Sequence, residues 1–590
     1  MSLLLTMPFI AKPRPRNLIL RPSIILMGVL LWGTPAITAQ ESSVALDALI
    51  QQEAEARETL QVEEAGYPVV SVELEGARAR SAATFLERAR ALEPGDLSRD
   101  EQLRLDSFIR SMEGRVRGYE NRNYLTPLNH ETGPHASFMR LGSRGSFPTV
   151  QEYDRYLNRL LAAGAYLEQY IVLMREGLAT GLTRPQEVLG GHEGMINGYL
   201  ADPPESSALA VPLHNIPASI PQGERERIRS QGLEAIRSAV YPALEQFRDF
   251  LVEEYIPGAR MTYSVAEFPG GQDYYEFLVR HHTTLEISAQ EVHDIGLSEV
   301  ARIRSEMEGI IQSVGFQGEF EDFLDFLRTD PQFYVETPEA LLMEASTLSK
   351  RIDGLLPAYF HLESLPRRPY GVEPVPADLA PNYTGGRYSL GFGDRAGFYW
   401  VNTYNLPSRP LYVLPALTLH EAVPGHHLQI ALAQEMHDGR GDGITAYSEG
   451  WALYAEFLGK EMGIYDGDPY SDFGRLTYEM WRACRLVVDT GIHALGWTRN
   501  QVREYLAANT ALSLHEVRTE TDRYIAVPGQ ALSYKIGELT IRRLRLEAEA
   551  ELGDAFQLKD FHHEVLKSGP VPLSALEENI RGWIQRGGGR

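Results

Sequence analysis

Three imidazoles and one carboxylate fall within the short segment Leu419-His-Glu-Ala-Val-Pro-Gly-His-His-Leu-Gln429. Leucine residues precede and follow this segment, so its pattern is that of a buried helix. Burying such polar groups is unfavourable unless they are paired or bind a metal. The alternative is a partly solvated helix that carries incidental histidines. Because Cys484 is the only cysteine in the chain, a metal site would have to be built from His, Asp and Glu.

The spacing of these histidines departs from the usual zinc-peptidase helix. In that motif two His four residues apart share one helix face, and a Glu beside the first acts as general base. Here the fourth residue after His420 is Pro424, and His426 would point about 120° away from His420 on an ideal helix. Because Pro424 cannot donate to the carbonyl of His420, the helix must bulge or kink. We therefore expect Val423 and Pro424 to act as an insertion that brings His426, rather than His427, into the ligand position.

A third ligand must come from another element. Glu449 lies 23 residues after His426, which is enough for the first helix to end and for a loop to lead into a second helix that packs back against the site. Two imidazoles and one carboxylate with an open fourth position form the catalytic zinc pattern. We predict one Zn²⁺ per chain, held by His420, His426 and Glu449, although Mn or Co could substitute. Glu421 should flank the metal as the catalytic base. Glu456 either orients a ligand histidine or is a surface carboxylate.

A second polar pattern lies in the segment from Met480 to His493. Arg482, Arg485, Asp489 and His493 fall within about 80° of one another on a helical wheel, and apolar residues fill the rest. The stripe predicts either a water-filled cavity or a buried ladder of ion pairs, in which Arg485 and Asp489 have the spacing of a helical pair. In the cavity interpretation, His493 acts in catalysis or an arginine contacts the substrate.

The motifs together resemble a bacterial family catalogued as domain of unknown function 885 (DUF885). The matching segments are His420-Glu421, Gly425-His426, Glu449-Gly-Trp-Ala452, Met174-Arg-Glu-Gly177, Pro269-Gly-Gly271, Thr283-Thr284 and Pro528-Gly-Gln-Ala-Leu-Ser-Tyr-Lys-Ile-Gly537. The family looks like a distant relative of helical zinc peptidases such as angiotensin-converting enzyme and neurolysin. Those enzymes carry the shorter form His-Glu-x-Gly-His, from which the extra Val423-Pro424 departs. The resemblance implies a large, mainly α, zincin-like metallopeptidase fold with a small β-sheet near the active site.

By the same resemblance, the segment that begins at Pro528 faces the site. Gln530 and Tyr534 share one helix face, and the Tyr534 hydroxyl could stabilise a developing oxyanion. Arg523 or Lys535 could hold a substrate carboxylate. The alternatives are a tyrosine packed in the core and solvated cations.

Helical periodicity dominates the chain from about residue 41 onward and predicts one amphipathic helix over 152–178. Capping boxes predict helix starts at Ser288, Thr498, Ser513 and Ser574. Residues 366–413 break this pattern, being rich in Pro, Gly and Tyr, and they contain a candidate strand, Gly397–Asn405, that could pair with an extended peptide. No repeat or long linker divides the chain, so residues 40–590 are expected to form a single large helical domain.

The N-terminal residues 1–39 have the pattern of a secretory signal peptide. Lys and Arg residues precede the apolar run Ile24–Trp32, and small residues up to Ala39 follow it. We expect cleavage after Ala39 and a periplasmic or secreted protein, with an uncleaved anchor as the alternative. Residue 40 is Gln rather than Cys, which gives no support for lipid attachment. No later segment is long and apolar enough to insert stably into a membrane.

The charge balance bears on the choice of partner. The 590 residues include 56 Lys and Arg against 80 Asp and Glu, for a net charge of −24. Such a balance disfavours nucleic acid as a partner, since phosphate binding needs a cationic face.

The leading hypothesis is a secreted or periplasmic zinc peptidase acting on short peptides, with an oligomeric state that the sequence does not indicate. A zinc amidase or esterase would use the same chemistry. A periplasmic peptide- or small-molecule-binding protein with a structural metal is the alternative from another class, but it would have no use for Glu421 beside His420.

Overall fold

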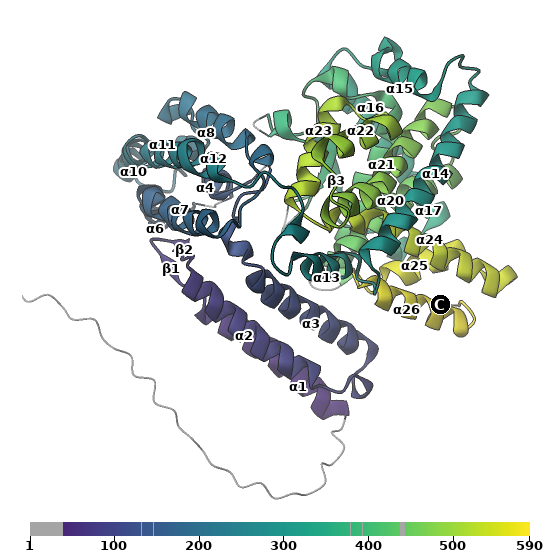
Figure 1. Ribbon diagram of the computed structural model, residues 1–590, viewed down its shortest axis with the longest axis horizontal. Coiled ribbons are helices and arrows are strands. Elements are labelled where there is room, and N and C mark those ends of the chain that lie inside the picture. Colours follow the sequence, from purple (N-terminus) through teal and green to yellow (C-terminus); the bar gives the residue numbers. More distant parts are fainter. Residues whose placement is uncertain are drawn as a thin grey trace, which may run out of the picture.

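The computed structural model describes residues 39–589 except 131, 145–146, 378, 392, 394 and 437–442. The predicted signal peptide lies outside the described residues apart from its last one, Ala39. The described chain is mainly helical, with two small sheets (Figure 1). None of its helices has the length and apolar character needed to span a bilayer.

The first long helices form an arm, drawn in purple in Figure 1: α1 (Ala39–Thr59), α2 (Val72–Arg90) and α3 (Arg99–Glu120). A two-stranded sheet, β1 (Glu63–Glu64) with β2 (Tyr67–Pro68), follows α1. The arm has its own apolar cluster, to which Leu49, Phe85 and Leu105 belong.

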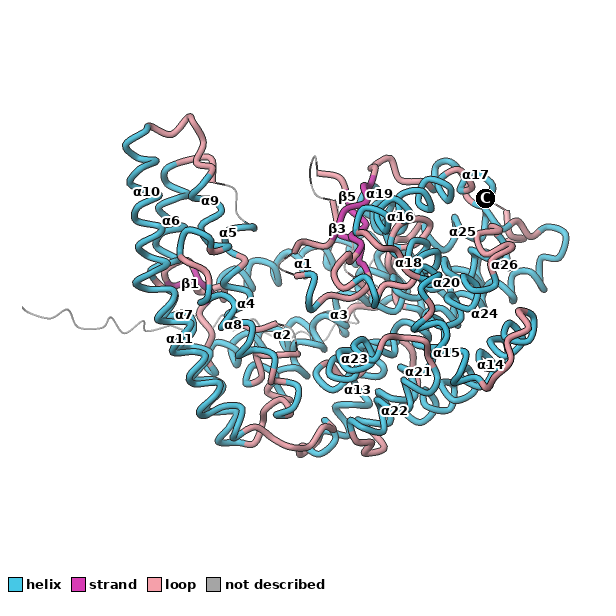
Figure 2. Tube along the Cα trace, turned by 90° about the horizontal axis from the view of Figure 1, so that it is seen from above, coloured by secondary structure: helices cyan, strands magenta, loops and turns pink. Residues whose placement is uncertain are grey.

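A lobe of helices follows the arm and stands beside the rest of the molecule (Figure 2). It comprises α4 (Pro134–Met139), α5 (Leu141–Arg144), α6 (Val150–Leu161), α7 (Ala163–Thr180), α8 (Gly191–Ala201), α9 (Val211–His214), α10 (Gln222–Ala235), α11 (Tyr241–Phe250) and α12 (Ile256–Gly258). The helix predicted over 152–178 is present as α6 and α7, which are separated at Ala162.

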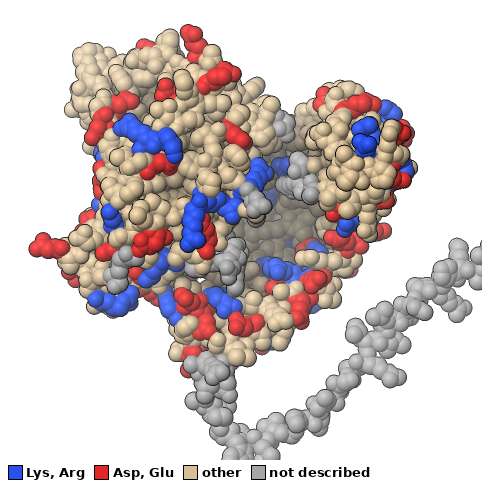
Figure 3. All heavy atoms as spheres, turned by 180° about the vertical axis from the view of Figure 1, so that it is seen from behind, with Lys and Arg blue, Asp and Glu red and all other residues tan. Residues whose placement is uncertain are grey.

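The remaining helices form the main body: α13 (Gly271–Thr283), α14 (Ala289–Ser313), α15 (Phe320–Thr329), α16 (Pro338–Asp353), α17 (Leu356–Tyr359), α18 (Leu414–Glu421), α19 (His426–Met436), α20 (Thr445–Glu461), α21 (Pro469–His493), α22 (Arg499–Asn509), α23 (Leu514–Ala526), α24 (Ser533–Leu552), α25 (Leu558–Leu566) and α26 (Leu573–Gln585). Phe247 of the lobe and Trp481 of the body belong to the same apolar cluster. Seen from behind, the surface is deeply hollowed between lobe and body, and Lys and Arg lie along the hollow (Figure 3).

The predicted helix caps are correct at three of four positions. Ser288 and Thr498 form capping boxes, and the Ser513 side chain accepts a hydrogen bond from the Glu516 N–H. The prediction at Ser574 was wrong, because α26 already begins at Leu573.

The larger sheet has three strands in the order β3-β5-β4, namely β3 (Tyr370–Pro374), β4 (Gly386–Ser389) and β5 (Gly397–Val401). The predicted strand Gly397–Asn405 is therefore β5, but it ends at Val401. The proposal that it pairs with a peptide was wrong, because β3 and β4 occupy its two sides. Within this sheet β3 and β4 are each paired on one side only.

Two glycines set how closely α20 and α24 approach. A Cβ added at Gly450 of α20 would lie 2.5 Å from Gly537 Cα, and one added at Gly537 of α24 would lie 2.0 Å from the Ala446 carbonyl oxygen. Backbone atoms cannot yield as side chains do, so both positions require glycine. This contact fixes the position of Glu449, the residue before Gly450.

We predict that Gly450→Ala lowers the free energy of unfolding by about 1–3 kcal/mol, the usual effect of overpacking. Gly309→Ala is the matched control, because Gly309 lies within α14 and its added Cβ would meet nothing within 4 Å. That variant should gain about 0.5–1 kcal/mol from the better helix propensity of alanine. Denaturant titration measures both, and a Gly450→Ala protein as stable as the wild type would contradict the close contact.

Candidate metal centre and its cleft

The chain between the two predicted histidine ligands is not helical. Helix α18 ends at Glu421 and α19 begins at His426, so the helix is interrupted where a bulge or kink was expected. The Val423–Pro424 peptide bond is cis. A Cβ at Gly425 would lie 2.0 Å from the His420 carbonyl oxygen, so glycine is needed for the chain to double back this tightly. Trp451 of α20 donates from Nε1 to the Pro424 carbonyl at 2.8 Å.

The interruption brings His420 and His426 together, as the sequence predicted for His426. Their ring centroids are 4.7 Å apart. Glu449 Oε2 lies 3.4 Å from His420 Nε2 and 3.3 Å from His426 Nε2. Glu421 is close to both rings as well: a carboxylate oxygen of Glu421 and one ring nitrogen from each histidine all lie within 4.8 Å of one another.

These groups fit a bound metal ion. Glu449 Oε2, which faces Nε2 of both histidines, is buried and has no well-formed hydrogen bond. Ligands of a tetrahedral zinc at 2.0–2.1 Å lie about 3.3 Å from one another, which matches the separations from Glu449 to the two imidazoles. An oxygen and two nitrogens form a donor set that zinc prefers. His420, His426 and Glu449 are therefore the residues that could hold the ion.

Glu456 orients the first histidine. Its Oε1 lies 2.7 Å from His420 Nδ1, and its side chain is almost completely buried, which excludes the surface-carboxylate alternative. Although burial lowers the pKa of His420, Glu449 and Glu456 raise it to about 10, so this environment favours a positive charge. Such carboxylate–histidine pairs fix the orientation of metal ligands.

Glu421 lies beside the candidate ligands, close enough to both histidines to share an ion with them. Its Oε2 accepts a hydrogen bond from the Tyr388 N–H of β4 at 2.8 Å. His427 points elsewhere: its Nδ1 lies 3.0 Å from the Tyr388 hydroxyl, and its ring packs against Tyr370. Burial lowers the pKa of His427 to about 4 and so keeps the ring neutral.

The cluster opens into a cleft of about 390 Å³, a volume typical of small-molecule sites. The segment Thr384–Tyr388, which includes most of β4, forms one wall. The opposite wall, here called the arginine wall, consists of Arg482, Arg485, Arg523, Gln530 and Tyr534.

The arginine wall carries more positive charge than its carboxylate neutralises. Arg485 donates to Glu520 at 3.0 Å, and Arg523 donates to the same carboxylate at 3.4 Å. Despite burial, these two arginines lower the pKa of Glu520 to about 2. Arg485 Nη1 and Arg482 Nε are buried without an acceptor. The nearest carboxylate to Arg482 is that of Glu456, at 3.7 Å, which already binds His420.

Tyr534 and Gln530 belong to this wall through Arg523, whose Nη2 donates to the Gln530 side chain at 2.7 Å and to the Tyr534 hydroxyl at 3.1 Å. The Arg485 guanidinium also lies 4.2 Å from the centre of the Tyr534 ring. Tyr534 thus faces the cleft, and its action on an oxyanion stays a prediction.

Two predicted site residues lie away from the cleft. His493 is buried, with Nδ1 accepting from the Val265 N–H and Nε2 facing the Tyr524 carbonyl, so the structure gives it a packing role instead of a catalytic one. Lys535 is also fully buried, and its Nζ pairs with Glu299, Glu479 and Glu538. It cannot hold a substrate carboxylate.

Arg485 and Asp489 do not form the predicted helical pair, because Arg485 pairs with Glu520. Asp489 instead accepts hydrogen bonds from the Tyr275 hydroxyl, at 2.6 Å, and from the Gly529 N–H. The stripe therefore divides into a cleft-lining half, Arg482 and Arg485, and a buried half, Asp489 and His493.

Sequence reasoning missed several cleft residues. The Tyr388 N–H acts through the backbone, and such a role leaves no trace in residue type. Tyr478, Trp481 and Glu516 line the cleft as well. Tyr478 and Trp481 precede Arg482 on α21, and the Arg482 guanidinium lies over both rings. This arginine–aromatic spacing was a signal available in the sequence.

Comparisons with known proteins extend these observations. Residues 58–580 match the model of a family described as bacterial protein of unknown function (DUF885). No curated protein matches the sequence. The crystal structure of a candidate lipoprotein from Colwellia psychrerythraea is similar at 27% identity and a TM-score of 0.83, covering 93% of this chain and 100% of that one. A candidate lipoprotein of unknown function from Shewanella oneidensis shares the fold, at 17% identity and a TM-score of 0.69 over 92% of this chain and 99% of that one.

We predict one zinc ion per chain in the purified protein, and loss of that metal in His426→Ala. His427→Ala is the matched control, because His427 is the neighbouring imidazole that binds Tyr388 instead. It should retain stoichiometric metal. Elemental analysis after dialysis measures both variants. Metal lost from His427→Ala and kept by His426→Ala would contradict the assignment.

Proposed function

The chain belongs to the DUF885 family of bacterial proteins, and we propose that it is a zinc-dependent peptidase that hydrolyses short peptides. The observation that carries this proposal is the convergence of His420, His426 and Glu449, with Glu421 beside them. The proposed fold type is that of the helical zincins. The preference for short peptides rests on the family resemblance described above.

The proposed chemistry divides between the ion and the chain. A zinc ion bound by the three ligands would polarise the scissile carbonyl and lower the pKa of a water molecule. Glu421, fixed by the Tyr388 N–H, accepts the proton of the attacking water and passes it to the leaving amine. Glu456 holds His420 in the orientation that binds metal through Nε2. Tyr534 is the proposed hydrogen-bond donor to the developing oxyanion.

The substrate orientation follows from the arginine wall. Its surplus of guanidinium groups favours an anion next to the His420–His426–Glu449 cluster. In a peptide without acidic side chains, that anion is the C-terminal carboxylate, which guanidinium groups bind strongly. We therefore place the C-terminal end of the peptide against Arg482, Arg485 and Arg523, in the role first considered for Arg523 or Lys535.

Two alternative functions are considered beside the peptidase. A zinc amidase or esterase would use the same ligands and base. A binding protein with a structural metal would need a closed coordination shell, whereas here the proposed ligands line an open cleft together with Glu421.

Two observations support a role outside the cytoplasm. Two structurally similar proteins are described as candidate lipoproteins, and the N-terminal residues have the pattern of a secretory signal. We propose that the mature protein acts in the periplasm or is secreted.

Glu421→Gln tests the proposed reaction, since it keeps the size of the side chain but removes the base. We expect the variant to fold and to retain zinc, with turnover of a peptide found by library screening reduced about 10²–10⁴-fold. Mass spectrometry of the products and elemental analysis provide the two measurements. Equal turnover by variant and wild type would exclude this mechanism.

Arg485→Gln tests the orientation of the substrate. We expect amidation of the peptide C-terminus to reduce wild-type kcat/KM about 10–100-fold, the effect of losing a hydrogen bond to a charged group. In Arg485→Gln the acid and the amide should differ less than threefold. Arg475→Gln is the control, because Arg475 is equally buried on α21 but lies outside the cleft. It should keep the wild-type preference, and a wild type indifferent to amidation would refute the orientation.

A further inference from the structure

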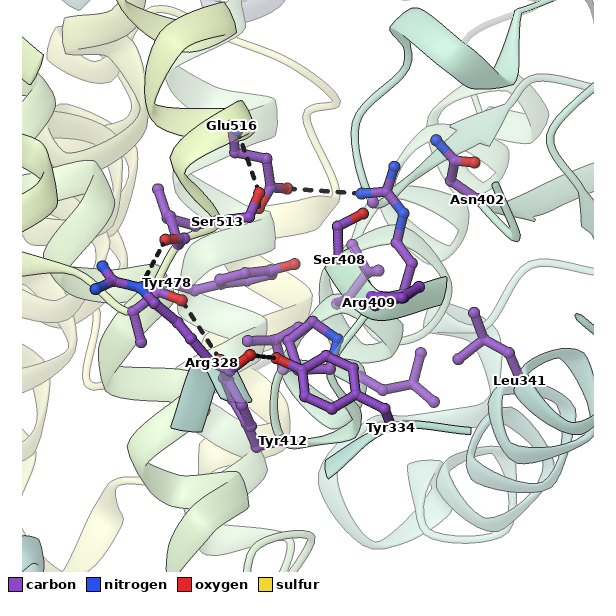
Figure 4. A pocket seen from close by; sticks show the side chains of 18 of the residues that line it. Arg328, Tyr334, Leu341, Asn402, Ser408, Arg409, Tyr412, Tyr478, Ser513 and Glu516 are labelled. Atoms are coloured by element: carbon purple, nitrogen blue, oxygen red, sulfur yellow. Dashed lines mark hydrogen bonds and ion pairs between the residues drawn. The ribbon is translucent and has the colours of Figure 1, made fainter. Parts of the chain in front are cut away.

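A second cavity of about 180 Å³ lies against the cleft. Its walls come from separate parts of the main body: Leu341 of α16, Val401 at the end of β5, the segment Pro407–Leu414 and the segment Ala511–Glu516 at the start of α23. Figure 4 shows Leu341, Arg409, Tyr478 and Glu516 around it.

The side pocket and the cleft share four lining residues. Gly385, Leu417, Tyr478 and Glu516 line both cavities. A Cβ added at Gly385 would lie 3.6 Å from the Tyr478 hydroxyl oxygen and 3.7 Å from Leu417 Cδ2, so these three residues lie together at the shared boundary. Leu417 lies one helical turn before Glu421. The side pocket is thus adjacent to the proposed site of bond cleavage.

Three polar side chains of the side pocket, those of Arg328, Asn402 and Ser408, are bonded within the protein. Arg328 donates to the carbonyls of Leu512 and Thr510, and the Asn402 amide nitrogen donates to three carbonyls, among them that of Ala380. Ser408 donates to the Asn405 carbonyl.

The charged groups of the pocket are also balanced. Arg409 faces Glu516, with Nη1 and Oε1 separated by 3.9 Å, and Figure 4 marks this pair. Arg328, the second arginine of the lining, pairs with Asp325 at 3.3 Å. Because such engaged groups offer a ligand few hydrogen bonds and no net charge, the pocket suits an uncharged, apolar occupant.

The size of the pocket narrows the choice of occupant. A dry cavity of about 150 Å³ lined by Leu, Ile and Phe binds benzene, and this pocket is slightly larger. Leu341, Leu414 and Leu512 contribute aliphatic surface, and Tyr334 and Tyr412 contribute rings.

We propose that the side pocket binds an aromatic or large aliphatic side chain of the substrate, from a residue next to the scissile bond. The proposal rests on the proposed peptidase function. It adds a side-chain preference, which neither the metal cluster nor the arginine wall supplies. The arginine wall selects a charged chain end, and the side pocket selects an apolar residue near it.

Paired peptides that differ only as Phe or Ala on either side of the cleaved bond test this subsite. We expect wild-type kcat/KM to favour Phe about 10–100-fold at one of the two positions, as apolar pockets discriminate by size. Ser408→Phe places a ring in the pocket from the wall away from the cleft and should reduce the ratio below threefold. Tyr404→Ala is the control, because Tyr404 is exposed and lines neither cavity. It should keep the wild-type ratio.

Gly385→Val is a second variant, in case Ser408→Phe does not fold. It adds bulk at the shared boundary beside Tyr478 and Leu417 and should also reduce the ratio. A wild type without preference at either position, or an unchanged ratio in whichever of the two variants folds, would overturn the proposal while leaving the peptidase function intact.

Binding provides a readout that does not depend on turnover. Calorimetric titration of the wild type with N-acetylphenylalaninamide and N-acetylalaninamide should give a Kd at least tenfold lower for the first, and Ser408→Phe or Gly385→Val should remove this difference. If no peptide is cleaved but this difference is observed, the peptidase function fails and the side pocket stands. Equal Kd values in the wild type would overturn the pocket assignment.

Discussion

The burial of Glu449 between two imidazoles is the constraint on which the site depends. An uncompensated carboxylate in this position would be strongly unfavourable, so the surrounding elements must supply positive charge at a fixed distance. Helix α20 does most of this positioning: it carries Glu449, it presents Glu456 to His420, and its Trp451 holds the carbonyl of Pro424. The Gly450–Gly537 contact then fixes α20 against α24, whose first turn carries Tyr534.

The cleft combines two opposite electrostatic environments on a protein with a net charge of −24. Carboxylates surround the imidazoles on one side, and guanidinium groups from α21 and α23 form the other. Glu520 partly neutralises the arginine side, because it remains ionised between Arg485 and Arg523. A ligand with an electron-rich atom for a metal and an anionic end for the arginines would complement both halves at once.

The sequence predicted the parts of this arrangement that depend on residue type and local spacing. The mainly helical fold and the proximity of His426 to His420 followed from proline chemistry and helix periodicity, whereas for Glu456 the sequence left open whether it orients a histidine or lies on the surface. Lys535 and His493 were misplaced for a common reason, since a helical wheel shows which residues share a face but not what that face packs against. Lys535 faces three carboxylates from two other helices and its own, and His493 faces backbone groups. The edge strand β4 was missed because strand order, which decides which strands lie at the edges of the sheet, is not visible in the sequence.

The described residues that line the cleft all fall between Thr384 and Tyr534. The arm and the lobe, which precede α13, supply none of them, although the surface hollow lies between lobe and body. The candidate site and the lobe side of the hollow therefore come from separate stretches of the sequence. Substitutions in the lobe can change the shape of the hollow without altering any residue that lines the cleft.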